Sequence, residues 1–117
     1  MKSAVRLTEL VSFYKALASR SRLRILSLLA ARSLCVNALA RSLGISQPAV
    51  SQHLEVLRMA RLVVGERAGT MVHYRLDREQ MRLVEASTSL LLRRSPDVVH
   101  ACSREASDAV QGEEGGS

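Results

Sequence analysis

Hydrophobic residues recur along the first thirty positions with the spacing of amphipathic helices. In residues 7–18 one stripe holds Leu7, Leu10, Val11, Tyr14, Leu17 and Ala18. Residues 20–31 predict a second helix, which Ser19 begins as its N-cap. Its expected inward positions are Leu23, Leu26 and Leu29. The pattern therefore predicts two successive helices that share one apolar core.

The stretch from residue 36 to residue 60 reads VNALARSLGISQPAVSQHLEVLRMA and predicts two short helices joined by a tight turn. The apolar stripe of the first helix is Val36, Leu39, Ala40 and Leu43, and that of the second is Val50, Leu54 and Leu57. Gly44 allows the positive φ of the turn, Ser46 caps the second helix, and Pro48 suits its first turn. A short polar helix held against a small apolar one is the geometry that enters a DNA major groove.

After residue 61 the periodicity changes from helical to alternating. Residues 62–67 and 71–76 predict two short strands of a β-hairpin, with Ala68-Gly69-Thr70 at its tip. Asp77 with Gln80 three positions later predicts the start of a fifth helix, which ends near Arg94. Its stripe is Met81, Val84, Thr88 and Leu91. Residues 95–117 predict a short helix followed by a polar, disordered tail.

Charge divides the chain at the same boundary. Residues 1–94 contain 16 of the 17 Lys and Arg residues and six of the 11 acidic residues, a formal net charge of +10. Residues 95–117 contain one base and five acids, a net charge of −4. A basic body suggests a polyanionic partner, although solubility or arginine-rich codon usage would also account for it. The chain therefore divides into a basic domain, 1–94, and an acidic C-terminal segment, 95–117.

Composition narrows the class of protein further. A length of 117 residues with 47% hydrophobic residues suits one compact domain with an aliphatic core. Two cysteines are too few for a disulfide framework. The chain has neither a secretory segment nor an apolar run long enough to span a bilayer. We therefore expect a soluble, cytoplasmic protein whose thiols are normally reduced.

The order helix, helix, helix, helix, hairpin, helix resembles the winged helix-turn-helix regulators of the ArsR/SmtB family. The segments that carry the resemblance are ALASRSRLRILSLL at 16–29, LCVNALARSLGISQPAVSQHLEVLRMARLV at 34–63 and GERAGTMVHYRLD at 65–77. The resemblance covers roughly residues 10–94 and implies a mainly α fold with a small β-hairpin wing. Where the family often has Asp-Pro-Thr-Arg, this chain has Ser19-Arg20-Ser21-Arg22, a change in the capping turn.

Several polar residues are candidates for DNA contact. Gln47, Ser51 and Gln52 could read base edges, and Arg41 and Arg58 could contact phosphates. The full set of candidates is Ser46, Gln47, Pro48, Ser51, Gln52, His53, Arg58, Arg41, and, in the wing, Arg67, Thr70 and Arg75. The alternatives are ordinary exposed polar side chains on the helix and exposed strand charges at Arg67 and Arg75. For His53 the alternative is a hydrogen bond within the scaffold.

One recognition helix reads only about four or five base pairs, too few for tight specific binding. The first and fifth helices carry more apolar residues than one small domain needs, and the resemblance implies pairing through these terminal helices. We therefore expect a C2 homodimer that binds an inverted repeat in double-stranded DNA. Repression by occupancy is the default mode, because no second domain is available to recruit polymerase.

A sensing function depends on the two cysteines. In metalloid-sensing members of the family, two cysteines separated by one residue begin the third helix, whereas this chain has Leu34-Cys35-Val36-Asn37. As(III) and other soft ions need two or three thiolates, so a partner for Cys35 would be Cys102 or His100, in the same subunit or the other. The alternative is that both cysteines only pack. The family's other metal pattern needs Asp and His spaced along the fifth helix, and residues 77–94 contain no His, so we expect no Zn²⁺ site there.

Other classes of function are less compatible with the residues. The three histidines, at 53, 73 and 100, belong to no recognisable catalytic constellation, and the chain has no glycine-rich phosphate loop. We therefore do not expect an enzyme. The remaining alternatives are a winged-helix regulator without metal sensing and a winged-helix module that binds another protein.

Overall fold

The computed structural model describes residues 5–93, which form five helices and a small antiparallel sheet. The helices are α1 (Leu7–Leu17), α2 (Arg20–Ala31), α3 (Val36–Leu43), α4 (Gln47–Met59) and α5 (Arg78–Leu92). The strands are β1 (Leu34–Cys35), β2 (Val63–Ala68) and β3 (Met71–Leu76). The predicted fold class, mainly α with a small β-hairpin, is confirmed. The predicted helix and tail of residues 95–117 lie outside the described residues, and the domain boundary at 94 stays a prediction.

The predicted pair of helices around Gly44 is confirmed, with the expected signals at the turn. Gly44 has a φ of 70°, and its N–H donates to the carbonyl of Ala40 at 2.9 Å. Ser46 begins α4 as its N-cap, and its hydroxyl accepts from the N–H of Ala49 at 3.2 Å. The side chains of Leu39, Val50, Leu54 and Leu57 are almost completely buried between the two helices and the rest of the core. The helix α4 is thus packed firmly against the apolar core.

The sheet has one strand more than the sequence predicts. β2 and β3 form the expected hairpin, and β1 pairs with the other edge of β3, with Leu34 opposite Tyr74 and Cys35 opposite His73. A strand of two residues carries no alternating pattern of its own, and its partner lies far later in the chain. Only the tertiary fold therefore creates it. Because β1 leads directly into α3 and pairs with β3, it connects the hairpin to the start of the helix-turn-helix.

The inward face of α1 differs from the predicted stripe. Leu10, Phe13 and Ala16 are buried, whereas Leu7 is 63% exposed, Val11 49% and Tyr14 44%. The predicted stripe is therefore divided: Leu10 faces the core, whereas Leu7, Val11 and Tyr14 do not. The helix has two apolar faces, and periodicity cannot say which of them the core covers. In α2, Leu26 and Leu29 are buried as predicted. The prediction that Leu23 points inward was wrong, because Leu23 is 51% exposed and Ile25 is buried instead.

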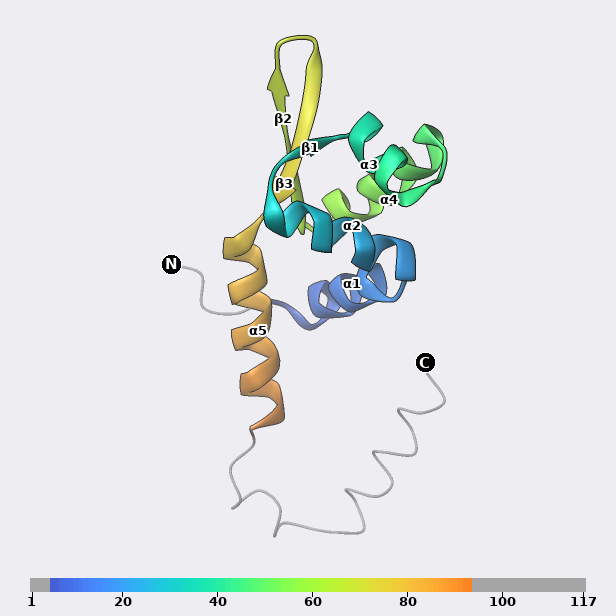
Figure 1. Cartoon of the computed structure of the whole chain (residues 1–117). Helices are drawn as coiled ribbons and strands as arrows, with labels where there is room; N and C mark the ends of the chain where they lie inside the picture. The colour runs from blue at the N-terminus through green and yellow to red at the C-terminus, as the bar shows by residue number, and fades with distance from the viewer. Residues whose placement is uncertain (1–4, 94–117) are drawn as a thin grey trace, which may run out of the picture.

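The wing and the C-terminal helix extend in opposite directions from the helical body (Figure 1). α5 begins at Asp77, whose carboxylate accepts from the N–H of Gln80 at 3.0 Å, as the capping pattern predicted. Two hydrogen bonds tie the middle of α5 to the N-terminal segment. Tyr14 Oη and Thr88 Oγ1 lie 2.6 Å apart, and the N–H of Val5 donates to Ser87 Oγ at 2.8 Å. Within residues 5–93, no helix combines the length and apolarity that a membrane span requires.

Candidate nucleic-acid interface

The helix α4 has one buried and one exposed face. Val50, Leu54 and Leu57 point into the core, and the opposite face presents Gln47, Ser51 and Gln52 to solvent. Ser46 and Pro48 are also exposed at the start of the helix. The helix N-terminus adds free backbone N–H groups and the positive end of the helix dipole, which favour a phosphate. This face can therefore offer both base-reading amides and phosphate-binding donors.

Two hollows border the start of α4 and share the residues Asn37 and Gln47. One, of about 540 Å³, is lined by Asn37, Ala40, Arg41, Ile45, Ser46 and Gln47. The other, of about 310 Å³, is lined by Cys35, Val36, Asn37, Gln47, Thr70, Met71, Val72 and Tyr74. The fold thus brings Arg41 and the wing residue Thr70 each into a hollow that Gln47 also lines. In the sequence, Asn37 occupies the position of the second cysteine of a metalloid sensor, and no local pattern predicts that it lies beside Gln47 of α4.

The sheet register separates the two wing arginines. Arg67 pairs with Val72 and Arg75 with Val64, so the two side chains lie on opposite faces of the hairpin. Arg75 is farther from the tip, and its Nε donates to Glu66 Oε2 at 3.0 Å. Arg67 lies near the tip and forms no ion pair within residues 5–93. Of the two, Arg67 is the better placed for an outside partner.

Arg58 is paired with an acid on the same helix. Its Nη2 donates to Glu55 Oε2 at 2.8 Å, and the two side chains are 53% and 57% exposed. The hydrogen bond from Arg58 lowers the pKa of Glu55, and the same contact raises the pKa of Arg58. The carboxylate therefore stays charged at neutral pH and opposes part of the positive charge that Arg58 would bring to a phosphate.

His53 is half-buried and contacts the scaffold. Its Nδ1 lies 3.3 Å from Nη1 of Arg22 on α2. This contact agrees with the alternative in which His53 forms a hydrogen bond within the protein. It is compatible with a DNA contact only through the remaining edge of the ring.

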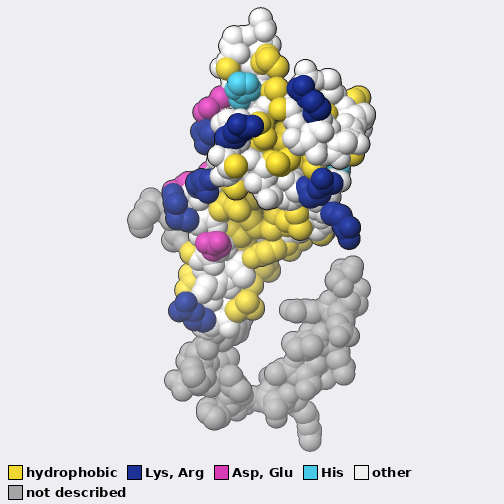
Figure 2. Space-filling view, viewed as in Figure 1, with side chains coloured by type: hydrophobic (Ala, Val, Ile, Leu, Met, Phe, Trp, Pro, Cys, Tyr) yellow, Lys and Arg dark blue, Asp and Glu magenta, His cyan; other side chains and the backbone are white. Residues whose placement is uncertain are grey.

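Lys and Arg side chains dominate the charged surface around the helix-turn-helix and the base of the wing on the face shown in Figure 2. Asp and Glu are fewer on that face. A polyanion approaching this side would therefore meet a net positive surface.

Cys35 ends β1 and stands directly before α3, as its N-cap residue. It is half-buried and lines the smaller hollow together with Gln47 and Thr70. Residues 5–93 contain no cluster of three His, Cys, Asp or Glu side chains that could hold a metal ion. One thiol beside Asn37 does not fit a soft ion, which needs more thiolates. The other predicted ligand, Cys102, lies outside the described residues.

Two comparisons bear on the family of the chain. The model of the family described as "Bacterial regulatory protein, arsR family" matches residues 19–64. A homodimeric winged helix-turn-helix DNA-binding domain from Mycobacterium bovis, described as a possible ArsR-family transcriptional regulator, superposes with a TM-score of 0.62 at 32% identity. That match covers 73% of this chain and 80% of the other. The chain belongs to the ArsR family.

Relatives within the ArsR family are named as regulators of transcription. The regulator KmtR of Mycobacterium tuberculosis is 47% identical over 72 residues, which are 62% of this chain and 55% of KmtR. The transcriptional repressor SmtB homolog of Synechocystis is 46% identical over 68 residues, 58% of this chain and 52% of the homolog. The chain thus spans about half the length of these relatives. Their names agree with the expectation of a regulator rather than an enzyme.

Proposed function

We propose that this ArsR-family protein is a cytoplasmic transcriptional repressor that binds an inverted-repeat operator in double-stranded DNA as a C2 homodimer. The observation that carries the proposal is the exposed face of α4. Gln47, Ser51 and Gln52 stand on a helix whose other side is locked into the core, so their positions are preorganised. Amide side chains on a rigid helix match the donor and acceptor pattern of bases in the major groove.

The neighbouring residues supply affinity without sequence information. Arg41 and Thr70 each line a hollow together with Gln47, and Arg67 lies near the tip of the wing. We assign phosphate contacts to Arg41 and Arg67. Arg58 and Arg75 would make such contacts by exchanging their carboxylate partners, Glu55 and Glu66, for a phosphate. The predicted result is binding that weakens steeply as salt rises.

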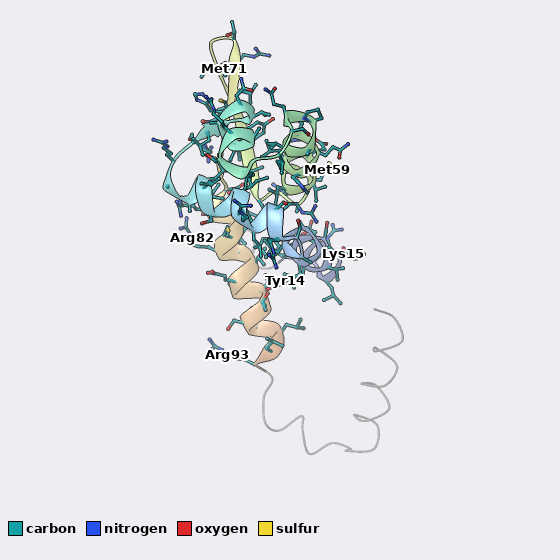
Figure 3. The ribbon with its side chains drawn as sticks, turned by 45° about the vertical axis from the view of Figure 1, so that its right-hand side comes forward. Tyr14, Lys15, Met59, Met71, Arg82 and Arg93 are labelled. Carbon is teal, nitrogen blue, oxygen red and sulfur yellow. The ribbon has the colours of Figure 1, made fainter. Side chains whose placement is uncertain are left out.

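Dimerisation rests on the second apolar face of α1. Leu7, Val11 and Tyr14 are exposed there and, with Leu91 of α5, line a hollow of about 420 Å³. Figure 2 shows hydrophobic side chains gathered over α1 and the adjoining part of α5, and Figure 3 places Tyr14 where the two helices meet. An apolar surface of this kind on a small domain is typical of an interface. We infer that a second copy covers it, as the homodimeric state of the M. bovis domain suggests.

The DNA proposal is tested by selecting genomic fragments that the purified protein retains and measuring their affinity by fluorescence anisotropy at several salt concentrations. Gln52→Ala should weaken binding and relax sequence preference, because it removes a base-reading amide. Ser27→Ala, at an exposed position on α2, is the control and should leave binding unchanged. Absence of binding down to low salt would instead support a winged-helix module that binds another protein.

The dimer proposal is tested by analytical ultracentrifugation at micromolar concentration. The proposed interface predicts a dimer. A monomer that still binds the selected fragments with full affinity would contradict it.

We further propose that a thiol-directed signal releases the DNA through Cys35, acting with Cys102. The observation in favour is the position of Cys35 in the same hollow as Gln47 and Thr70, two residues of the proposed DNA surface. A group added to this half-buried thiol would occupy the space between α3, α4 and the wing. The alternative is a regulator of the same DNA-binding type in which Cys35 only packs.

This second proposal is tested by adding As(III), Cd²⁺ or a thiol oxidant to the protein–DNA complex. Wild type should release the DNA with at least one of these reagents, and Cys35→Ser should not. Equal responses from wild type, Cys35→Ser and Cys102→Ser would show that neither thiol senses the signal.

A further inference from the structure

One arginine in the first turn of α2 contacts two other helices. Arg22 is fixed by its own backbone N–H, which donates to the hydroxyl of the N-cap Ser19 at 3.2 Å. Its Nε donates to the carbonyl of Ala16 at 2.7 Å, and its Nη2 to the carbonyl of Lys15 at 3.4 Å. Both carbonyls belong to the last turn of α1, where the helix dipole favours a cation (Figure 3 labels Lys15). Arg22 therefore closes the end of α1.

The third contact of the same guanidinium reaches the recognition helix. Nη1 of Arg22 lies 3.3 Å from Nδ1 of His53, which directly follows Gln52 on α4. A guanidinium can only donate, so Nδ1 is the acceptor in this contact. Because the guanidinium is a rigid planar fork, its contacts with α1 and with α4 have a fixed relative geometry.

We propose that Arg22 and His53 form a joint that positions the recognition helix relative to the end of α1. The inference rests on the proposed function, in which α4 reads DNA and α1 forms part of the dimer interface. Without the joint, α4 keeps its apolar contacts, but its rotation relative to α1 is less restricted. In a dimer that must place two copies of α4 in successive major grooves, such freedom lowers affinity. Arg22 is thus a positioning residue and does not itself contact DNA.

Paired substitutions separate this joint from general stability. His53→Leu has a similar shape to histidine without an acceptor, and it should weaken binding to the selected fragment about tenfold, the scale of one hydrogen bond to a charged group. His53→Asn keeps an acceptor at the position of Nδ1 and should stay within about twofold of wild type. Arg22→Lys keeps the charge but loses the fork and should resemble His53→Leu. The matched control is Arg24→Lys, at an exposed position on the same helix.

The decisive measurement is the double variant Arg22→Lys/His53→Leu. If the two residues act as one joint, the second substitution adds little to the loss in affinity caused by the first. Losses that multiply would mean that each side chain acts alone, with His53 contacting DNA directly, and would overturn the inference. Sedimentation and thermal melting of each variant verify that the protein remains a folded dimer.

Failure of the joint can be distinguished from failure of the proposed function. Wild type that binds DNA, together with variants that bind equally well, overturns the joint alone. Wild type that binds no fragment at any salt concentration overturns the proposed function and the joint with it. Equal losses for His53→Leu and His53→Asn would also contradict the joint, because Asn retains the acceptor.

Discussion

The ion pair between Glu55 and Arg58 provides a sharp test of the DNA-binding proposal. Glu55→Gln removes a negative charge from the exposed side of α4 and releases Arg58 from a 2.8 Å contact. If Arg58 faces a phosphate, the freed guanidinium can neutralise it. We therefore predict that Glu55→Gln increases affinity for DNA.

The release of counterions from DNA sets the size of the expected gain in affinity. One additional neutralised phosphate on B-DNA steepens the dependence of log affinity on log salt by about 0.9, which corresponds to a gain of about eightfold at about 0.1 M salt. Because the hydrogen bond from Arg58 lowers the pKa of Glu55, the Glu55 carboxylate remains charged until the pH falls below the ordinary pKa of a glutamate. Over neutral and mildly acidic pH, only substitution removes this charge. Both side chains are more than half exposed, so stability should change little.

The assay is fluorescence anisotropy of the selected fragment across a salt series, with a matched control on another helix. Glu79 pairs with Arg82 on α5 with the same spacing along the helix, at 3.2 Å and with similar exposure. Glu79→Gln removes the same charge from the chain as a whole, but not from α4. Equal gains for the two variants would show an effect of net charge only. No gain and no change in salt dependence for Glu55→Gln would refute the placement of Arg58 beside a phosphate.

Three further predictions concern stability and assembly. Leu57→Ala should lower the free energy of unfolding, measured in urea, by about 2–5 kcal/mol, because this side chain is fully buried. Its control, Met59→Ala, changes a side chain that is 68% exposed and should lower it by less than about 0.5 kcal/mol. Gly44→Ala should cost about 1–2 kcal/mol in the same assay; its φ is 70° and nothing lies within 4 Å of an added Cβ, so the whole cost is backbone strain. Val11→Glu should shift the sedimentation profile toward monomer and weaken operator binding while the circular dichroism spectrum stays helical, and an unchanged dimer would exclude this face of α1 from the interface.

Local signals in the sequence were sufficient for the helix-turn-helix. Ser46 and Asp77 are capping residues whose preference is set by their own next three positions, and both cap helices as predicted. Gly44 takes the left-handed conformation because the turn needs it. The stripe of Val50, Leu54 and Leu57 is buried because no other apolar face of α4 competes with it. These features depend on neighbours within a few residues, which a sequence displays directly.

The contacts between distant segments required the tertiary structure. Periodicity placed Leu7, Leu10, Val11 and Tyr14 on one apolar stripe, but of these only Leu10 is buried, together with Phe13 and Ala16. Both faces of α1 are apolar, and only packing chooses between them. The pairing of β1 with β3 joins segments far apart in the chain, which no local pattern encodes. The placement of Arg67 and Arg75 on opposite faces follows from the register of the hairpin.

The sequence by itself thus determined the elements of a DNA reader, its exposed amides and its family resemblance, because these depend on residue type and short-range spacing. Only the tertiary structure decided which partners those residues meet. It paired Arg75 with Glu66 across two strands, linked His53 through Arg22 to α1, and placed Cys35 beside Gln47 and Thr70. The physical reason is that hydrogen bonds and hollows between elements form where the packed core positions the backbone, and that position depends on the whole chain.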